Sequence, residues 1–138
     1  MMNGLHAMGP SVIRAATTKD TYFAALFLAT ATRGAADKVY SVTGEVTGTG
    51  YTAGGVAVTT ATAPALSGTT AVFTPSASVV FTGVTLASAF DCVLIYNSTS
   101  ASKLALSTHT FGSQTVTAGN FTLTMPVNDA SNALVRIA

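Results

Sequence analysis

The chain has 138 residues, a formal net charge of +1 and only 8% charged residues, while 49% of its residues are hydrophobic. This length corresponds to about one domain, and high hydrophobicity with low net charge argues against a chain that is disordered throughout. The six Lys and Arg residues are scattered, which argues against nucleic-acid binding, and no apolar run reaches the roughly 18 residues of a membrane span.

Residues 1–18 are predicted to form a short irregular N-terminal arm, and residues 19–138 a single domain. The apolar side chains of the arm approximate helical spacing, but Gly9-Pro10 interrupts the pattern. Its start lacks the continuous apolar region of a signal peptide, so export is not expected. The arm can lie on its own domain or on a neighbouring subunit, and two side chains are expected to anchor it at such an interface: Met8 and Ile13.

β-strand patterns prevail from Asp20 onward. In residues 22–28, large apolar side chains occur on both alternating sets of positions, as in a strand that is covered on both faces. A helix is the alternative for this segment, because alanines are frequent in it. Residues 32–38 are predicted to form a polar loop, and residues 39–42 a brief strand.

The remainder of the chain contains short segments rich in β-branched and aromatic residues, bounded by Gly, Pro, Ser or Asn. Seven to nine short strands without helical patterns predict an all-β fold, an antiparallel β-sandwich or a jelly-roll-like barrel. Cys92 is the only cysteine, and its apolar neighbours predict a buried free thiol. The predicted strands are 56–59, 70–73, 79–81, 84–86, 92–96, 104–106, 121–125 and 134–137.

The scarcity of charge predicts an oligomer. A soluble monomer usually has a charged surface and protects exposed strand edges with Lys, Pro or inward-pointing charges, and few such residues are available here. Thr is polar and β-branched, so it suits the outer face of a strand without adding charge. Part of the exterior is therefore expected to be covered by other subunits.

The segment GTGYTAGGVAV, residues 48–58, begins like a dinucleotide-binding fingerprint. That motif requires a helix after the glycines and an acidic residue about 20 positions later. A strand pattern follows instead, and no Asp or Glu occurs between Glu45 and Asp91. The glycines are therefore predicted to form a turn or bulge with a positive φ angle at one or more of them, and no cofactor is expected. Tyr51 is expected to be an aromatic anchor at this corner and a third interface residue.

No residue pattern predicts an enzyme. The two histidines, His6 and His109, are too few and too far apart for a metal site, and His109 is expected to be a surface or packing residue. No Gly-x-Ser-x-Gly motif occurs, so a hydrolytic triad is not supported. Asp129 is predicted to cap a turn within residues 128–132.

Three segments together resemble a group of small structural proteins from the virion modules of tailed bacteriophages: GTGYTAGGVAV at 48–58, LIYNSTSASKLAL at 94–106 and FTLTMPVNDASNALVRI at 121–137. The resemblance implies a virion protein on the capsid exterior, made in the host cytoplasm. It implies a decoration (cement) protein that binds the major capsid protein as a homotrimer or other homo-oligomer, with no nucleic-acid or membrane partner. The alternative is a tail, fibre or spike-associated module that contacts the host surface, with glycans as candidate ligands.

Overall fold

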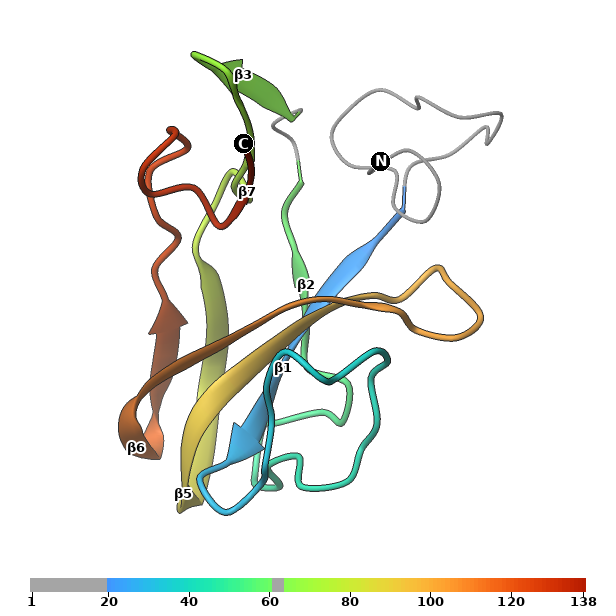
Figure 1. Cartoon of the computed structure of the whole chain (residues 1–138). Helices are drawn as coiled ribbons and strands as arrows, with labels where there is room; N and C mark the ends of the chain where they lie inside the picture. The colour runs from blue at the N-terminus through green and yellow to red at the C-terminus, as the bar shows by residue number, and fades with distance from the viewer. Residues whose placement is uncertain (1–19, 61–63) are drawn as a thin grey trace.

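The computed structural model describes residues 20–60 and 64–138, which form an all-β fold, as the sequence predicts (Figure 1). Two antiparallel sheets give a sandwich-like arrangement, with strand orders β2-β1-β5-β6 and β3-β4-β7. No helix in this part of the chain is long and apolar enough to cross a membrane. The strands are β1 Tyr22–Leu28, β2 Val56–Val58, β3 Ala65–Ser67, β4 Thr70–Phe73, β5 Val79–Asn97, β6 Ala105–Leu123 and β7 Val135–Ile137.

The two long strands, β5 and β6, fold back on themselves as a pair, and this bend brings the two halves of the β5–β6 ladder to face each other. Figure 1 shows both strands running toward the lower left and turning there. The β5–β6 register shifts repeatedly between Phe81 and Cys92, where extra residues form bulges. A bulge bends its strand and increases the local twist, so these shifts turn one ribbon into two facing layers.

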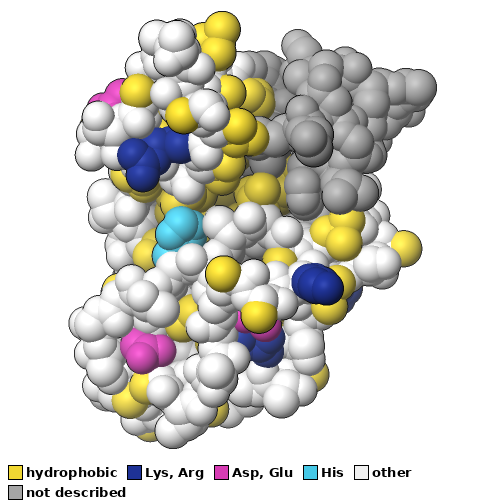
Figure 2. All heavy atoms as spheres, viewed as in Figure 1, with side chains coloured by type: hydrophobic (Ala, Val, Ile, Leu, Met, Phe, Trp, Pro, Cys, Tyr) yellow, Lys and Arg dark blue, Asp and Glu magenta, His cyan; other side chains and the backbone are white. Residues whose placement is uncertain are grey.

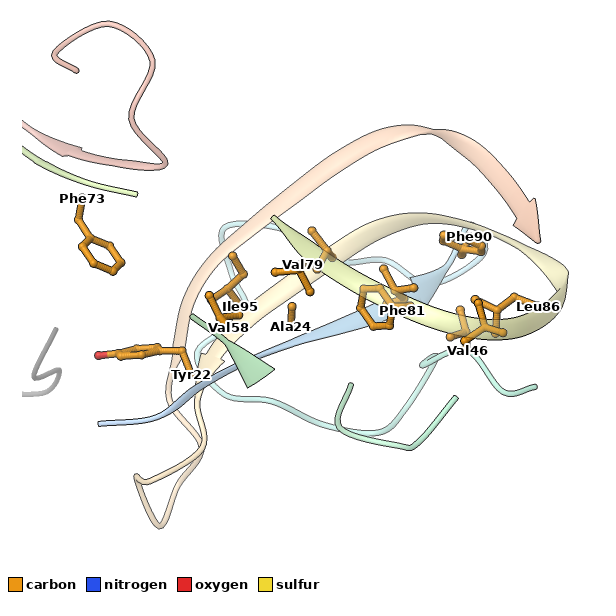
Figure 3. Packing of buried hydrophobic residues seen from close by; sticks show 13 residues of the cluster. Tyr22, Ala24, Val46, Val58, Phe73, Val79, Phe81, Leu86, Phe90 and Ile95 are labelled. Atoms are coloured by element: carbon orange, nitrogen blue, oxygen red, sulfur yellow. The ribbon is translucent and has the colours of Figure 1, made fainter. Parts of the chain in front are cut away.

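The main core fills the space that this bend encloses. Figure 3 shows buried side chains of β1 and of both halves of β5 gathered there. The ring of Phe90 meets Phe111 and Phe121 edge-on, with centroid distances of 6.0 and 5.0 Å. Because Phe111 and Phe121 lie on different halves of β6, these contacts join the two layers. Such aromatic pairs add about 0.5–1.5 kcal/mol each beyond area burial.

β1 is buried on both faces, as predicted. Ala24 and Leu26 face the main core, while Ala25 and Phe27 belong to a second cluster with Cys92 on the opposite face. Segment 29–44 contributes to covering this second face, and the Arg33 guanidinium lies 4.1 Å from the centre of the Phe27 ring. Cys92 is buried and free, which confirms the prediction for the thiol.

Two predictions about strand boundaries are wrong. Residues 79–96 form part of one 19-residue strand instead of three short ones, because bulges absorb the small residues at 82–83 and 87–89 without ending the ladder with β6. Residues 39–42 form no strand: Val39 makes a single bridge to Leu104. The sequence patterns also failed to predict β3 and the middle of β6. The middle of β6 is rich in Ser, Thr and Gly, a composition typical of loops.

The prediction for the turn at residues 128–132 is confirmed. Asp129 Oδ1 accepts hydrogen bonds from the backbone N–H groups of Ser131 and Asn132, at 2.8 and 2.7 Å. Hydrogen bonds from the side-chain amide of Asn132 and from these backbone groups lower the pKa of Asp129. The turn leads into β7, so this carboxylate helps to fix the approach of the last strand to the small sheet.

Candidate functional site

The glycine-rich segment closes the gap between β1 and the first half of β5. The N–H of Val46 donates to the carbonyl of Leu26 at 3.0 Å, and the N–H of Thr85 donates to the carbonyl of Thr49 at 2.9 Å. Residues 44–50 therefore bridge two strand segments. We call residues 44–55 the corner segment.

Three glycines of the corner segment, Gly48, Gly50 and Gly55, lie too close to neighbouring backbone to carry side chains. A Cβ atom on Gly48 would lie 2.0 Å from the carbonyl oxygen of Thr85, and one on Gly55 would lie 1.8 Å from that of Ala24. Gly50, Gly54 and Gly55 have positive φ angles of 77°, 94° and 77°. The predicted conformation is confirmed. β2 follows the segment directly, which differs from the helix that a phosphate-binding loop requires.

A buried carboxylate lies at the centre of the corner segment. Glu45 is only 6% exposed. Its Oε1 accepts hydrogen bonds from the hydroxyl of Tyr51 at 2.6 Å and from the N–H of Gly54 at 2.7 Å, and its Oε2 accepts one from the hydroxyl of Tyr40 at 2.6 Å. Hydrogen bonds to an ionised acceptor are about twice as strong as neutral ones. These neutral donors take the place of water around the carboxylate.

Two further contacts tie this group to the sheet. The Tyr51 hydroxyl accepts a hydrogen bond from the N–H of Leu26 at 3.0 Å, and the Tyr96 hydroxyl donates to the carbonyl of Gly54 at 2.9 Å. The ring of Tyr96 also stacks on Tyr40, with 4.4 Å between centroids. The corner segment is thus fastened to β1 and β5. We call Tyr40, Glu45, Tyr51, Gly54 and Tyr96 the Glu45 cluster.

The electrostatics of the Glu45 cluster keep its tyrosines protonated. Burial and the hydrogen bond to Glu45 raise the pKa of Tyr51 well above its ordinary value of 10.0, and the same two causes raise the pKa of Tyr40. Burial, followed by the charge of Glu45, raises the pKa of Tyr96. The hydroxyls therefore act as hydrogen-bond donors at neutral pH. This arrangement can hold a loop in place, and its tyrosines are poorly suited to serve as bases.

The raised pKa of Tyr51 predicts a loss of stability at alkaline pH. Above pH 10.0 the unfolded chain releases this proton while the folded chain retains it. The free energy of unfolding should then fall by up to about 1.4 kcal/mol per pH unit for this residue. Urea denaturation from pH 8 to 11 measures the slope. In Tyr51→Phe the slope above about pH 10 should be shallower; equal slopes would contradict the prediction.

The residues predicted for an interface do not meet at one described site. Tyr51 is half-buried: its hydroxyl binds Glu45 and its ring stacks on Phe81 with 5.8 Å between centroids. It anchors the corner, as predicted, and its role in an interface stays a prediction. Met8 and Ile13 lie outside the described residues.

Other candidate groups remain separate from one another. His109 is half-buried on β6, and burial lowers its pKa. In residues 20–60 and 64–138, no three His, Cys, Asp or Glu side chains gather in a way that could hold a metal ion. His6 lies outside that part of the chain.

A shallow depression of about 420 Å³ lies beside segment 29–44 and includes Arg33 in its lining. The guanidinium forms an ion pair with Asp37 at 3.1 Å and donates to the carbonyls of Ser41 and Thr43. These bonds hold Arg33 within its own loop. The depression therefore presents hydroxyl groups of Thr and Ser more than a cation.

The known proteins add no further information on the identity of the chain. Comparisons with protein-family models, with curated proteins and with solved structures found no match.

Proposed function

We propose that this protein is a structural subunit of a tailed-bacteriophage virion, a capsid decoration protein that binds the major capsid protein as a homo-oligomer. The protein would stabilise the capsid by adding contacts between subunits, because a protein that binds only the assembled state of the shell stabilises that state. The three-segment resemblance points to a virion, and the observation that carries the proposal is the nearly neutral surface of the folded domain.

Most of the few charged side chains of the domain are buried or interact with neighbouring groups of the same chain. Glu45 is buried, and Arg33 pairs with Asp37. Lys103 lies 5.1 Å from the centre of the Tyr40 ring, and Arg136 donates to backbone carbonyls of the turn at 130–131. Figure 2 shows one face of the molecule, on which charged side chains are few. Such a surface suits burial against other subunits, because little charge must be desolvated.

Exposed apolar side chains on the small sheet support the same function. Leu66 pairs with Ala71, and Ala71 pairs with Ile137, so the three form one row across β3, β4 and β7. Leu66 is 76% exposed and Ile137 46% exposed. Apolar surface of this kind is more typical of proteins that contact a partner than of free monomers.

The alternative of a glycan-binding tail module receives less support. Its candidate aromatic residues, Tyr40, Tyr51 and Tyr96, have their hydroxyls engaged within the Glu45 cluster. A sugar-binding platform usually presents such rings and hydroxyls to solvent. The structural role therefore explains these tyrosines more simply.

The copy number of the chain in purified virions tests the proposal. A decoration protein covers the shell and should be present in hundreds of copies, measured by a quantitative gel or mass spectrometry against the major capsid protein. A dozen copies or fewer would favour the tail module, and a chain absent from virions would overturn both.

A further inference from the structure

β6 is the longest outer strand in the described part of the chain. It has 19 residues and forms one edge of the four-stranded sheet, whereas the other outer strands, β2, β3 and β7, have three residues each. An outer strand leaves backbone N–H and C=O groups pointing away from its sheet, where another strand can pair with them. The outer side of β6 is therefore the main pairing surface of the domain.

Only the start of this edge is covered by another described segment. The N–H of Ala105 donates to the carbonyl of Lys38, and the N–H of Tyr40 donates to the carbonyl of Lys103, both at 2.9 Å. From Leu106 onward, no segment within residues 20–60 or 64–138 forms a ladder with the outer side of β6. The available edge thus begins at Leu106.

The available edge is regular over its first residues. Ser107–Thr110 pairs with Cys92–Ile95 residue by residue, whereas the register shifts on both sides of this stretch. Bulges twist an edge away from further strands, but a regular ladder keeps it straight. We call Leu106–Thr110 the open segment; Ser107–Thr110 is its regular part, and Leu106 lies at the register shift. The five residues of the open segment match the usual length of a strand in a globular protein, about 5–6 residues.

The open segment lacks every residue type that protects natural edges. All 19 residues of β6 are free of Lys, Arg, Asp, Glu and Pro. A charged strand would repel a second copy of itself, whereas an uncharged strand does not. Thr108 and Thr110 lie opposite Leu94 and Cys92, on the same face of the sheet. Threonines on facing strands form favourable cross-strand pairs.

We propose that the open segment pairs in antiparallel fashion with the open segment of a second copy of this chain. The two four-stranded sheets then form one continuous sheet across a two-fold axis, the commonest symmetry of homo-oligomers. This contact deepens the proposed function and rests on it for its biological setting, because it supplies a self-association surface for a virion subunit.

Two buried polar atoms of the open segment lack hydrogen-bond partners in the described part of the chain, as expected if a second strand normally lies beside β6. Ser107 Oγ and His109 Nε2 are buried, and neither has a hydrogen-bond partner among the described residues. Most buried polar atoms in native proteins have a partner. In the proposed pairing Ser107 of one copy lies opposite His109 of the other, on the same face of the sheet.

Charge placed on the open segment tests the pairing. Sedimentation velocity of the full chain should show a dimer, or a multiple of it, whose dissociation follows protein concentration. In an antiparallel pair of open segments the central residue, Thr108, faces Thr108 of the second copy, so Thr108→Lys and Thr108→Glu should each raise the dimer dissociation constant at least about tenfold, because like charges then face each other. An equimolar mixture of the two variants should associate again. Thr82→Lys, an exposed position on the inner strand β5, is the matched control and should behave as wild type.

Sedimentation of the wild type and of the charged variant can each overturn the proposed pairing. A wild-type chain that stays monomeric at all concentrations contradicts it, as does a Thr108→Lys variant that associates like wild type with circular dichroism unchanged. The virion copy number is a separate measurement. A monomeric chain present in hundreds of copies per virion would retain the proposed function and reject this pairing, and a dimer absent from virions would do the reverse.

Discussion

Gly55→Ala is expected to lower the free energy of unfolding by at least about 4 kcal/mol, which is the range of the most severe single substitutions. The new Cβ would lie 1.8 Å from the carbonyl oxygen of Ala24, in the middle of β1, and 2.6 Å from its carbonyl carbon. Both atoms belong to backbone that is held in a ladder with β5, so neither can move without breaking the sheet. The φ angle of 77° adds strain for any residue with a side chain.

Gly68→Ala is the matched control for this prediction. Gly68 has a similar φ angle of 63°, but a Cβ at this position would meet nothing within 4 Å. Its substitution should cost only the conformational strain, about 1–2 kcal/mol. Urea denaturation followed by circular dichroism compares the two, and soluble yield serves where Gly55→Ala does not fold. Equal losses in the two variants would mean that backbone strain alone, without close packing, requires glycine in the corner.

The class of fold could be predicted because strand patterns depend on local chemistry. Apolar side chains on both alternating sets of positions indicate β1 and its two buried faces, and the positive φ angles of Gly50, Gly54 and Gly55 are indicated by their residue type alone. β4 was predicted with its observed bounds because Thr70–Phe73 is rich in β-branched and aromatic residues and follows a Gly-Thr turn.

The arrangement of the long strands could not be predicted in the same way. The stretch at 107–120 is rich in Thr, Ser and Gly, and it becomes a strand because β5 supplies a partner for its backbone. Pairing of this kind joins residues far apart in the chain, so no local pattern reports it. Bulges near Gly83 and Phe90 also interrupt the alternation of apolar positions in β5, so the sequence pattern predicts three short strands where there is one.

The Glu45 cluster is invisible in the sequence for a related reason. Glu45 stands between Gly44 and Val46, where a charged side chain usually points to solvent. Its partners Tyr40, Tyr51 and Gly54 are close in sequence, but only the sharp turn of the corner segment directs their donors to one point. A buried carboxylate among tyrosines therefore requires the fold before it can be recognised.

Glu45→Ala is expected to lower the free energy of unfolding by about 2–6 kcal/mol, because it leaves two buried neutral donors without an acceptor, at about 1–3 kcal/mol each. The hydroxyl of Tyr51 and the N–H of Gly54 would lose their bonds inside the protein, while the half-exposed Tyr40 can turn to water. The loss should appear in urea denaturation, and faster hydrogen exchange at the Gly54 amide should place it at the corner segment.

Two further variants separate the carboxylate from charge in general. Glu45→Gln keeps one acceptor oxygen and should lose less, about 1–2 kcal/mol, since a neutral acceptor makes weaker bonds than a charged one. Asp91→Ala removes a half-buried carboxylate on β5, outside the Glu45 cluster, and should change stability by no more than about 0.5 kcal/mol. If Glu45→Ala unfolds at the same urea concentration as wild type, the cluster does not stabilise the fold. If Glu45→Gln is as unstable as Glu45→Ala, the negative charge itself holds the corner segment against β1 and β5, because the amide retains the shape of the carboxylate and one of its oxygens.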